Sequence, residues 1–326
     1  MTVSEATKGL KVVVIGAGQA GFSVCSKLRS LGFQGKITLV GDEKHPPYQR
    51  PPLSKAYLLG DMALERLFFR PQTFYAEKKI DLILSRAATS IDRSSSTVNL
   101  SDGTQTTYDR LVLATGSSPV TLPPKIAGKL GGIHNMRTLA DADGMQAAIR
   151  PGRAALVVGG GYIGLEAAAV AAKSGMNVTL VEASGRILQR VASPETSDYF
   201  RSLHLGNGVD SREGVMLQEL AGDRGHVVSA ILSDGSRVAA DCVIVGIGIR
   251  SNDEMASAAG LEIENGIRVD EQCRTSDPDI FAIGDCASFP YRTGRVRLES
   301  VGNAIDQGEI AARVIMRDDA IYLAKP

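Results

Sequence analysis

Two glycine-rich turns carry the residue types that could do chemistry in this chain. The first reads GAGQAG over residues 16–21 and follows the apolar run Val12–Ile15; the second reads GGGYIG over 159–164 and follows Leu156–Val158. Glycine at such a turn lets a phosphate approach the backbone, and a helix that starts there offers unpaired N–H groups and the positive end of its dipole. The sequence therefore predicts two sites for the pyrophosphate of a dinucleotide, and two dinucleotides in one chain indicate electron transfer between them.

An acidic residue follows each turn, after the next apolar run. Asp42 and Glu182 lie about 20 residues beyond their glycines, the spacing at which a carboxylate accepts hydrogen bonds from an adenosine ribose. Glu182 would also repel a 2′-phosphate, which favours NADH over NADPH. Arg186 and Arg190 lie close by in the sequence and could hold such a phosphate, so NADPH stays open as an alternative.

The hydrophobic pattern predicts the strands and helices that these turns need around them. Around the first turn it predicts strands over 11–15, 36–40, 108–116 and 279–285, with helices over 19–31 and 303–316. Around the second turn it predicts a helix over 141–150, a βαβ unit over 154–182, and a β-meander with turn signals from about 209 to 245.

This order of elements predicts an α/β fold of two Rossmann-like domains with parallel sheets, plus the small β-meander. The chain has 326 residues, more than one ordinary core accommodates. We expect the domain of the first turn to be discontinuous, residues 1–117 and 248–326, and the domain of the second turn to be inserted as residues 118–247.

The composition argues against several classes of protein. Lys and Arg together number 36, as do Asp and Glu, so the net charge is zero and no long-range field favours nucleic acid or a membrane surface. No run of about 18 apolar residues could span a membrane. The four cysteines are scattered without a CxxC pair and the four histidines are also scattered, so we expect no metal site, reduced thiols and a cytoplasmic location.

Five motifs occur in an order that is typical of one known family. They are Gly16–Gly21, Arg50–Lys55 (RPPLSK), Leu113–Gly116 (LATG), Gly159–Glu166 and Thr275–Cys286. From about residue 11 to about 312, the chain resembles the FAD-dependent NAD(P)H:ferredoxin reductases of the putidaredoxin-reductase type. The resemblance implies glutathione-reductase-like domains, with FAD bound by residues 1–117 and 248–326 and NAD by 118–247. It also implies hydride transfer from NADH to FAD and release of single electrons to a [2Fe–2S] ferredoxin, which serves a P450 or a ring-hydroxylating oxygenase.

The resemblance also implies roles for individual residues. On the FAD side it assigns Gly16, Gly18, Gly21, Asp42, Arg50, Lys55, Ala88, Arg137, Asp285 and Val301. On the NAD side it assigns Gly159, Glu182, Gly246, Ile247 and Gly248. Further cofactor contacts are expected from Ala20, Ala114, Thr115, Gly116, Gly161, Tyr162, Ile163, Gly164 and Gly284. Lys55 and Glu166 are expected to meet beside the flavin as the catalytic pair, where their opposite charges would shape the site near N5 without supplying a proton for the hydride step.

Two features depart from the family pattern. Family members continue beyond this point with a tryptophan-containing segment and a third domain, whereas this chain stops at Pro326 and contains no tryptophan, so we expect the C-terminal domain to be missing. Glu309 stands where relatives often carry a basic residue, which weakens the expectation that this helix docks an acidic ferredoxin.

Other activities share most of these motifs. A rubredoxin reductase or an NADH oxidase-type flavoenzyme would carry nearly all of them. A protein like apoptosis-inducing factor would use NADH-driven flavin reduction as a signal rather than for turnover. A pyridine nucleotide:disulfide reductase is less favoured, because neither Cys25 nor Cys286 has another cysteine close to it in the sequence.

Overall fold

A five-stranded parallel sheet organises the first of two units of the computed structural model, which describes residues 7–324. The strands lie in the order β19 (Ile280–Ala282), β7 (Arg110–Leu113), β1 (Lys11–Ile15), β2 (Lys36–Val40) and β3 (Ile80–Ile83). Every neighbouring pair is parallel, and β1, β2 and β7 are almost wholly buried, as expected for parallel strands covered by helices.

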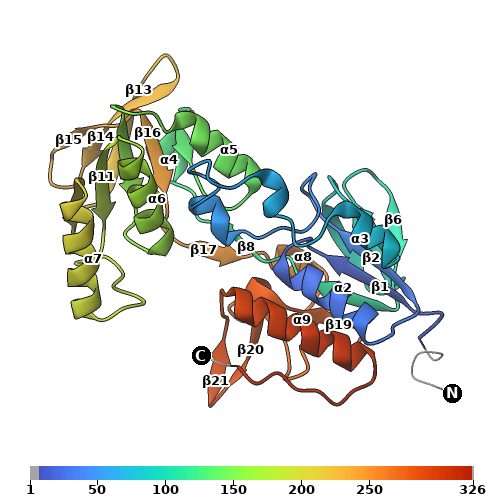
Figure 1. The fold of residues 1–326 in the computed structure, drawn as a ribbon. Coiled ribbons are helices and arrows are strands. Elements are labelled where there is room, and N and C mark those ends of the chain that lie inside the picture. The colour runs from blue at the N-terminus through green and yellow to red at the C-terminus, as the bar shows by residue number, and fades with distance from the viewer. Residues whose placement is uncertain (1–6, 325–326) are drawn as a thin grey trace. The chain divides into compact units, whose positions relative to one another are not determined.

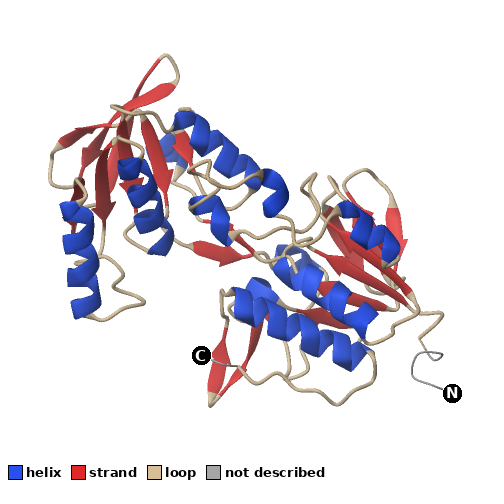
Figure 2. Cartoon of the chain, in the orientation of Figure 1, coloured by secondary structure: helices blue, strands red, loops and turns tan. Residues whose placement is uncertain are grey.

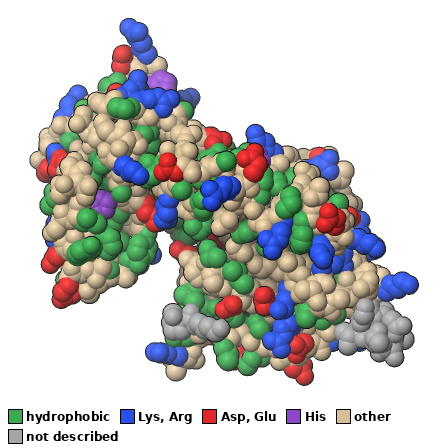
Figure 3. Space-filling view, viewed as in Figure 1, with side chains coloured by type: hydrophobic (Ala, Val, Ile, Leu, Met, Phe, Trp, Pro, Cys, Tyr) green, Lys and Arg blue, Asp and Glu red, His purple; other side chains and the backbone are tan. Residues whose placement is uncertain are grey.

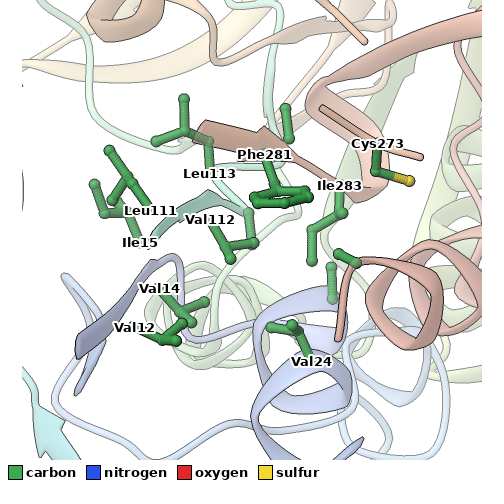
Figure 4. Packing of buried hydrophobic residues seen from close by; sticks show 14 of the residues in the cluster. Val12, Val14, Ile15, Val24, Leu111, Val112, Leu113, Cys273, Phe281 and Ile283 are labelled. Carbon is green, nitrogen blue, oxygen red and sulfur yellow. The ribbon is translucent and has the colours of Figure 1, made fainter. Parts of the chain in front are cut away.

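Helices α2 (Gln19–Ser30) and α9 (Val301–Ile315) run side by side in this unit (Figure 1). Their close approach depends on Gly308, where a Cβ would lie 2.9 Å from the Cβ of Ser23. Figure 4 shows Val24 of α2 with Val112 and Phe281 of the sheet in the buried core.

Two smaller sheets, one antiparallel and one mixed, also belong to the first unit. One sheet contains β4 (Ala88–Asp92), β5 (Thr97–Leu100) and β6 (Gln105–Thr107), for which the sequence pattern made no prediction. A further three-stranded sheet contains β18 (Ile267–Arg268), β20 (Ala287–Tyr291) and β21 (Gly294–Val296), of which β20 and β21 are antiparallel. The short helices are α3 (Gln72–Glu77), α8 (Glu254–Ala258) and the 3₁₀ turn η3 (Gly284–Cys286).

The second unit repeats the parallel-sheet arrangement. Its strands lie in the order β12 (Val209–Glu213), β11 (Asn177–Glu182), β10 (Ala154–Val158), β16 (Cys242–Val245) and β9 (Ile133–His134), all parallel. Its helices are α4 (Pro124–Ala127), α5 (Leu139–Ala148), α6 (Tyr162–Lys173) and α7 (Pro194–Gly206), with 3₁₀ turns η1 (Pro51–Ser54) and η2 (Leu64–Arg66). An antiparallel meander is formed by β13 (Leu217–Asp223), β14 (His226–Leu232) and β15 (Arg237–Ala239). Figure 2 marks the helices and strands of each unit.

The predicted α/β class with two parallel sheets and a meander is confirmed, and the differences are local. The meander is smaller than predicted, because β12 and β16 pair with β11 and β10 in the parallel sheet. Helix α5 begins two residues before the predicted start because Thr138 and Asp141 form a capping box. Helix α9 also begins earlier than predicted, because the Ser300 hydroxyl accepts the N–H of Asn303.

The boundaries of the two units differ in one respect from those expected. The first unit comprises residues 1–49, 68–118 and 251–326, and the second comprises 50–67 and 119–250. Segment 50–67 was expected with the first turn but packs in the second unit, where Leu58 is part of the core and the Tyr57 hydroxyl donates to Asp143 of α5. The chain passes between the units near β8 (Ser117–Pro119) and β17 (Ile249–Ser251).

Figure 3 shows basic and acidic side chains mixed over the visible face. Among residues 7–324, no helix is long and apolar enough to cross a membrane. In the same range, no group of three or more His, Cys, Asp or Glu side chains is arranged to hold a metal ion.

We predict that Gly164→Ala destabilises the protein. A Cβ at Gly164 would overlap the carbonyl oxygen of Gly159, and both partners are backbone held by the sheet and α6. Overpacking of this kind costs about 1–3 kcal/mol in the free energy of unfolding, measurable by urea denaturation. Gly206→Ala is the control, because Gly206 lies in α7 with open space around it, and it should be neutral or stabilising by up to about 1 kcal/mol. Equal effects of the two substitutions would contradict the packing argument.

Candidate functional site

The carboxyl ends of the parallel strands bring the first set of predicted residues to one edge of the first unit. Gly16 follows β1, Ala114 follows β7 and Gly284 lies just beyond β19, and these strands are adjacent and parallel. Asp42 follows β2 on the other side of β1. Such an edge is where open α/β sheets bind nucleotides.

Close backbone packing shapes the first turn. Gly16 has φ +109°, and a Cβ there would overlap the carbonyl oxygen of Ala114. A Cβ at Gly21 would overlap the carbonyl oxygen of Gly16 in the same way. Gly284, at φ +77°, places its α-carbon close to Ala20, since a Cβ there would lie 3.1 Å from the Ala20 Cβ. Gly16 therefore packs against both Ala114 and Gly21, and Gly284 packs against Ala20.

The second unit repeats this geometry. Gly159 has φ +106°, and a Cβ there would overlap the carbonyl oxygen of Gly246. Gly248 follows at φ +121°. Glu182 ends β11 beside the turn, and Arg137 lies just beyond β9 at the same edge of the sheet. The predicted NAD-side glycines Gly159 and Gly246 therefore lie together.

The starts of α2 and α6 differ from the other long helices. Helices α5, α7 and α9 have the N-cap residues Thr138, Ser193 and Ser300, whose side chains accept a backbone N–H of the first turn. The N-cap residues of α2 and α6 are Gly18 and Gly161, which have no side chain to act as a cap. The N–H groups of these two first turns are therefore available to an external anion.

Gly18 and Gly161 also have no structural requirement for glycine. Both have extended backbone angles that any residue adopts, with φ −95° and −82°, and no atom of residues 7–324 lies within 4 Å of a Cβ built on either. Glycine at these positions keeps space open beside uncapped helix ends. A pyrophosphate fits this space and these donors, so the residues present are compatible with one dinucleotide on each unit.

Glu182 is fixed at the second turn by backbone hydrogen bonds. Its Oε2 accepts the N–H of Gly160 at 2.6 Å and its Oε1 accepts the N–H of Ser184 at 2.7 Å. Each oxygen retains lone-pair capacity for a ribose hydroxyl. Arg186, in contrast, donates to the hydroxyl of Ser197 at 2.6 Å and to the Gln189 carbonyl at 3.3 Å, so it is committed to the start of α7, while Arg190 is exposed.

The register distinguishes Asp42 from Glu182. Ile15 pairs with Val40 in the first unit, as Val158 pairs with Val181 in the second, so Gly41 rather than Asp42 occupies the position equivalent to Glu182. A Cβ at Gly41 would lie 2.6 Å from the Cβ of Ala17. The sequence spacing treated the two acids alike, but Asp42 lies one residue further along, where it is exposed. Its role at the ribose stays a prediction.

Lys55 and Glu166 meet in the second unit, as the resemblance implied. The Lys55 ammonium lies 2.7 Å from Oε2 of Glu166, and both side chains are partly exposed. The hydroxyl of Ser54 donates to the same oxygen at 2.6 Å and is almost fully buried. Sequence reasoning missed Ser54, although it precedes Lys55 in the Arg50–Lys55 motif. The carboxylate thus has a fixed geometry with one oxygen held by a cation and a hydroxyl.

Two other predicted FAD contacts also lie in the second unit. Nη1 of Arg50 donates to the carbonyl of Arg137 at 2.6 Å, which places both residues beyond β9.

Apolar side chains at this unit's turns are exposed, namely Tyr162, Ile163 and Ile247. Exposed apolar groups beside an open helix start are suited to contact with a ligand.

The remaining predicted residues belong to the first unit. Oδ2 of Asp285 accepts the hydroxyl of Ser117 at 2.9 Å, and the Thr115 hydroxyl donates to the carbonyl of Asn252 at 2.6 Å. Gly116 has φ +69°, and Val301 is the exposed first residue of α9. Ala88 begins β4, two residues after Arg86, whose N–H donates to the Gly41 carbonyl at the strand edge.

The cysteines do not form a reactive pair. All four are free and buried. Burial raises the pKa of Cys25 to about 12 and that of Cys242 to about 11, and it also raises the pKa of Cys273 and Cys286. The thiolate, which is the nucleophile in disulfide exchange, is therefore disfavoured at each position.

Comparison with known proteins identifies the family. Residues 10–308 match the description "Pyridine nucleotide-disulphide oxidoreductase". The chain belongs to this family. It is 42% identical to rhodocoxin reductase of Rhodococcus erythropolis, over 97% of this chain and 74% of that protein. It is 38% identical to a rubredoxin-NAD(+) reductase of Pseudomonas putida, over 94% of this chain and 80% of that protein. A crystal structure of putidaredoxin reductase in its covalent complex with putidaredoxin matches with a TM-score of 0.94 and 42% identity, over 97% of this chain and 78% of that chain.

We predict that Gly18→Ala and Gly161→Ala weaken dinucleotide binding without loss of stability. The added methyl groups meet no protein atom but occupy the space beside the uncapped helix ends. The FAD affinity of Gly18→Ala and the NADH affinity of Gly161→Ala should each fall by about tenfold or more, while the urea midpoint of the cofactor-free protein is retained. Titration calorimetry measures the first effect, and circular dichroism in urea measures the second. Unchanged affinities would show that these glycines do not face the cofactors.

Proposed function

We propose that this chain is a flavoprotein reductase that passes electrons from NADH to a [2Fe–2S] ferredoxin of an oxygenase or P450 system. The observation that carries the proposal is the repeated, uncapped glycine turn, one on each unit, in a chain that shares 42% identity with rhodocoxin reductase. When bound, FAD supplies two-electron uptake from NADH and one-electron release to the ferredoxin. FAD and NAD(H) are the cofactors that this family uses.

The residues of the second unit would bind and orient the pyridine nucleotide. The N–H groups at the start of α6 would hold the pyrophosphate, and Glu182 would accept the ribose hydroxyls while its charge would exclude a 2′-phosphate. Lys55 and Glu166 would border the reacting ring as a neutral pair. The Ser54 hydroxyl fixes the Glu166 carboxylate, and the Lys55 ammonium pairs with that carboxylate. The ammonium of Lys55 is therefore held in one orientation rather than many.

The residues of the first unit would bind FAD. The N–H groups at the start of α2 face its pyrophosphate, and the Asp285 carboxylate, oriented by Ser117, would accept a hydrogen bond from the ribityl chain. This assignment uses the same strand edge that brings Gly16, Ala114 and Gly284 together. We also propose that the protein acts in the cytoplasm, where its four buried thiols remain reduced.

A rubredoxin is the alternative acceptor, because a rubredoxin-NAD(+) reductase shares 38% identity with this chain. Both acceptors use the same donor half-reaction, so only the second half-reaction distinguishes them. A [2Fe–2S] ferredoxin remains the preferred partner, since the putidaredoxin reductase that matches with a TM-score of 0.94 was crystallised in a complex with putidaredoxin.

We predict that the FAD-reconstituted protein is reduced rapidly by NADH and slowly by NADPH. Anaerobic stopped-flow absorbance records the bleaching of the flavin with each nucleotide, and subsequent mixing with a [2Fe–2S] ferredoxin or a rubredoxin records the transfer onward. Glu182 should make NADPH at least about tenfold less effective than NADH. A bound flavin that NADH cannot reduce would refute the reductase assignment. Fast reduction followed by negligible transfer to either acceptor would favour a signalling flavoprotein instead.

We predict that Lys55→Ala lowers the limiting rate constant of flavin reduction by on the order of tenfold, which corresponds to about 1.4 kcal/mol in the barrier. The substitution removes the ammonium that Glu166 orients and leaves the carboxylate without its counter-charge. The NADH dissociation constant from the same stopped-flow series should change less than the rate constant. Lys125→Ala is the matched control, because Lys125 is an exposed lysine of the same unit. Unaltered kinetics for Lys55→Ala would remove the residue from the site.

A further inference from the structure

The turn that contains Asp285 is fixed by a hydrogen bond from its backbone to a buried side-chain amide. Gly284 begins the 3₁₀ turn η3 at φ +77°, and its N–H donates to Oε1 of Gln307 at 2.7 Å. Gln307 lies on α9 and its side chain is inaccessible to solvent. The position of Asp285 therefore depends on the orientation of one glutamine amide.

Asn303 lies one helical turn earlier and connects to the same oxygen. Its Nδ2 donates to the carbonyl of Leu298 at 2.9 Å and approaches Oε1 of Gln307 at 3.5 Å. Its own N–H donates to the Ser300 hydroxyl that caps α9. Asn303 is buried, so its amide has no access to bulk water as an alternative partner.

The third side chain in this series of hydrogen bonds is Tyr322, which lies in the last described segment of the chain. Its hydroxyl donates to Oδ1 of Asn303 at 2.7 Å. The ring packs edge-on against Phe289 with centroids 5.0 Å apart, and the Tyr322 N–H donates to the Glu271 carbonyl at 2.6 Å. Burial is the main cause that raises the pKa of Tyr322 to about 12, so the hydroxyl stays protonated and remains a donor.

The directions of these hydrogen bonds determine one another. A backbone N–H can only donate, so Gln307 must turn its oxygen toward Gly284. Asn303 must then present its nitrogen to that oxygen, and its own oxygen must face away toward Tyr322. If the Asn303 amide flipped, two oxygens would oppose each other beside Gly284. The tyrosine hydroxyl, which can donate to Oδ1, and the Leu298 carbonyl, which can only accept from Nδ2, together make the flip unfavourable.

We propose that Tyr322, Asn303 and Gln307 form a positioning relay that fixes the Gly284–Asp285 turn for the cofactor, so that these three residues set the FAD affinity without touching FAD. The proposal rests on the proposed function only in naming FAD as the ligand of the turn. The relay itself is a property of the chain without cofactor.

The test is Tyr322→Phe, which keeps the ring and removes the hydroxyl. Loss of one buried hydrogen bond should raise the FAD dissociation constant by about fivefold and speed amide exchange at Gly284 in the cofactor-free protein by about the same factor. Fluorescence titration with FAD measures the first, and hydrogen exchange of the cofactor-free protein measures the second. The melting temperature of the cofactor-free protein should change little, because the ring contact with Phe289 is retained.

Tyr75→Phe is the matched control. Tyr75 belongs to the same core cluster, and its buried hydroxyl has no hydrogen-bond partner among residues 7–324, so removing it breaks no relay. Asn303→Leu provides a second variant of similar size that interrupts the relay at its centre. In a double-mutant cycle, adding Tyr322→Phe to Asn303→Leu should produce no further loss.

The outcomes separate the relay from the proposed function. If exchange at Gly284 rises in Tyr322→Phe but not in Tyr75→Phe, the relay is supported whether or not NADH reduces the flavin. If the exchange and the FAD affinity of Tyr322→Phe equal those of the unsubstituted protein, the relay is overturned. Additive effects in the double-mutant cycle would also overturn it. Failure of the unsubstituted chain to bind FAD would refute the proposed function, and the exchange measurement would still decide the relay.

Discussion

A pyrophosphate can rest on a helix N-terminus only if the backbone before that helix turns sharply between two parallel strands. In this chain the turn is possible because Gly16 passes against the carbonyl of Ala114, and Gly159 passes against the carbonyl of Gly246. Both glycines have positive φ, so neither the space nor the conformation accepts a side chain. The strands β7 and β16 that supply these carbonyls lie next to β1 and β10, and this adjacency depends on the hydrophobic burial of all four strands. Packing of the cores therefore determines where the anion sites lie.

Charge then selects what the two edges can bind. The first turns of α2 and α6 present N–H groups without a side-chain competitor, which attracts phosphate at both edges. At the second edge Glu182 opposes additional phosphate, and Arg186, which could have offset it, is engaged by Ser197 and by backbone carbonyls. The engaged arginine cannot be recognised from the sequence, because Arg186 and Arg190 both follow Glu182 closely and the hydrogen bonds of Arg186 appear only in the structure.

Local patterns predicted the central elements, and long-range contacts account for what they missed. Strands 11–15 and 36–40 were predicted to the residue because each is a short run of β-branched and other apolar residues, interrupted only by Thr38, after one exposed lysine. The β4–β6 sheet gave no signal, since its strands are short and β4 is largely exposed. The packing of residues 50–67 in the second unit depends on Leu58 and Tyr57, whose partners lie far along the chain: Asp143, which accepts the Tyr57 hydroxyl, is 86 residues away. Ser54 was missed for the same reason, because a serine in a proline-rich loop shows its role only when Glu166 is seen beside it.

The three consecutive glycines of the second turn illustrate why a motif alone cannot assign function. Gly159 is required by the neighbouring strand, whereas a Cβ at Gly160 would lie 2.6 Å from the side chain of Ile187 and 3.2 Å from the Cβ of Glu182. Gly160 therefore makes room for the acid and for the core beneath it. In the first unit Ala17 fills the equivalent space. There the residue that follows the neighbouring strand β2 is Gly41 instead of an acid. Among the glycines of the two turns, only Gly161 and its counterpart Gly18 lack any such neighbour within residues 7–324, so an external ligand, rather than the fold, explains glycine at these two positions.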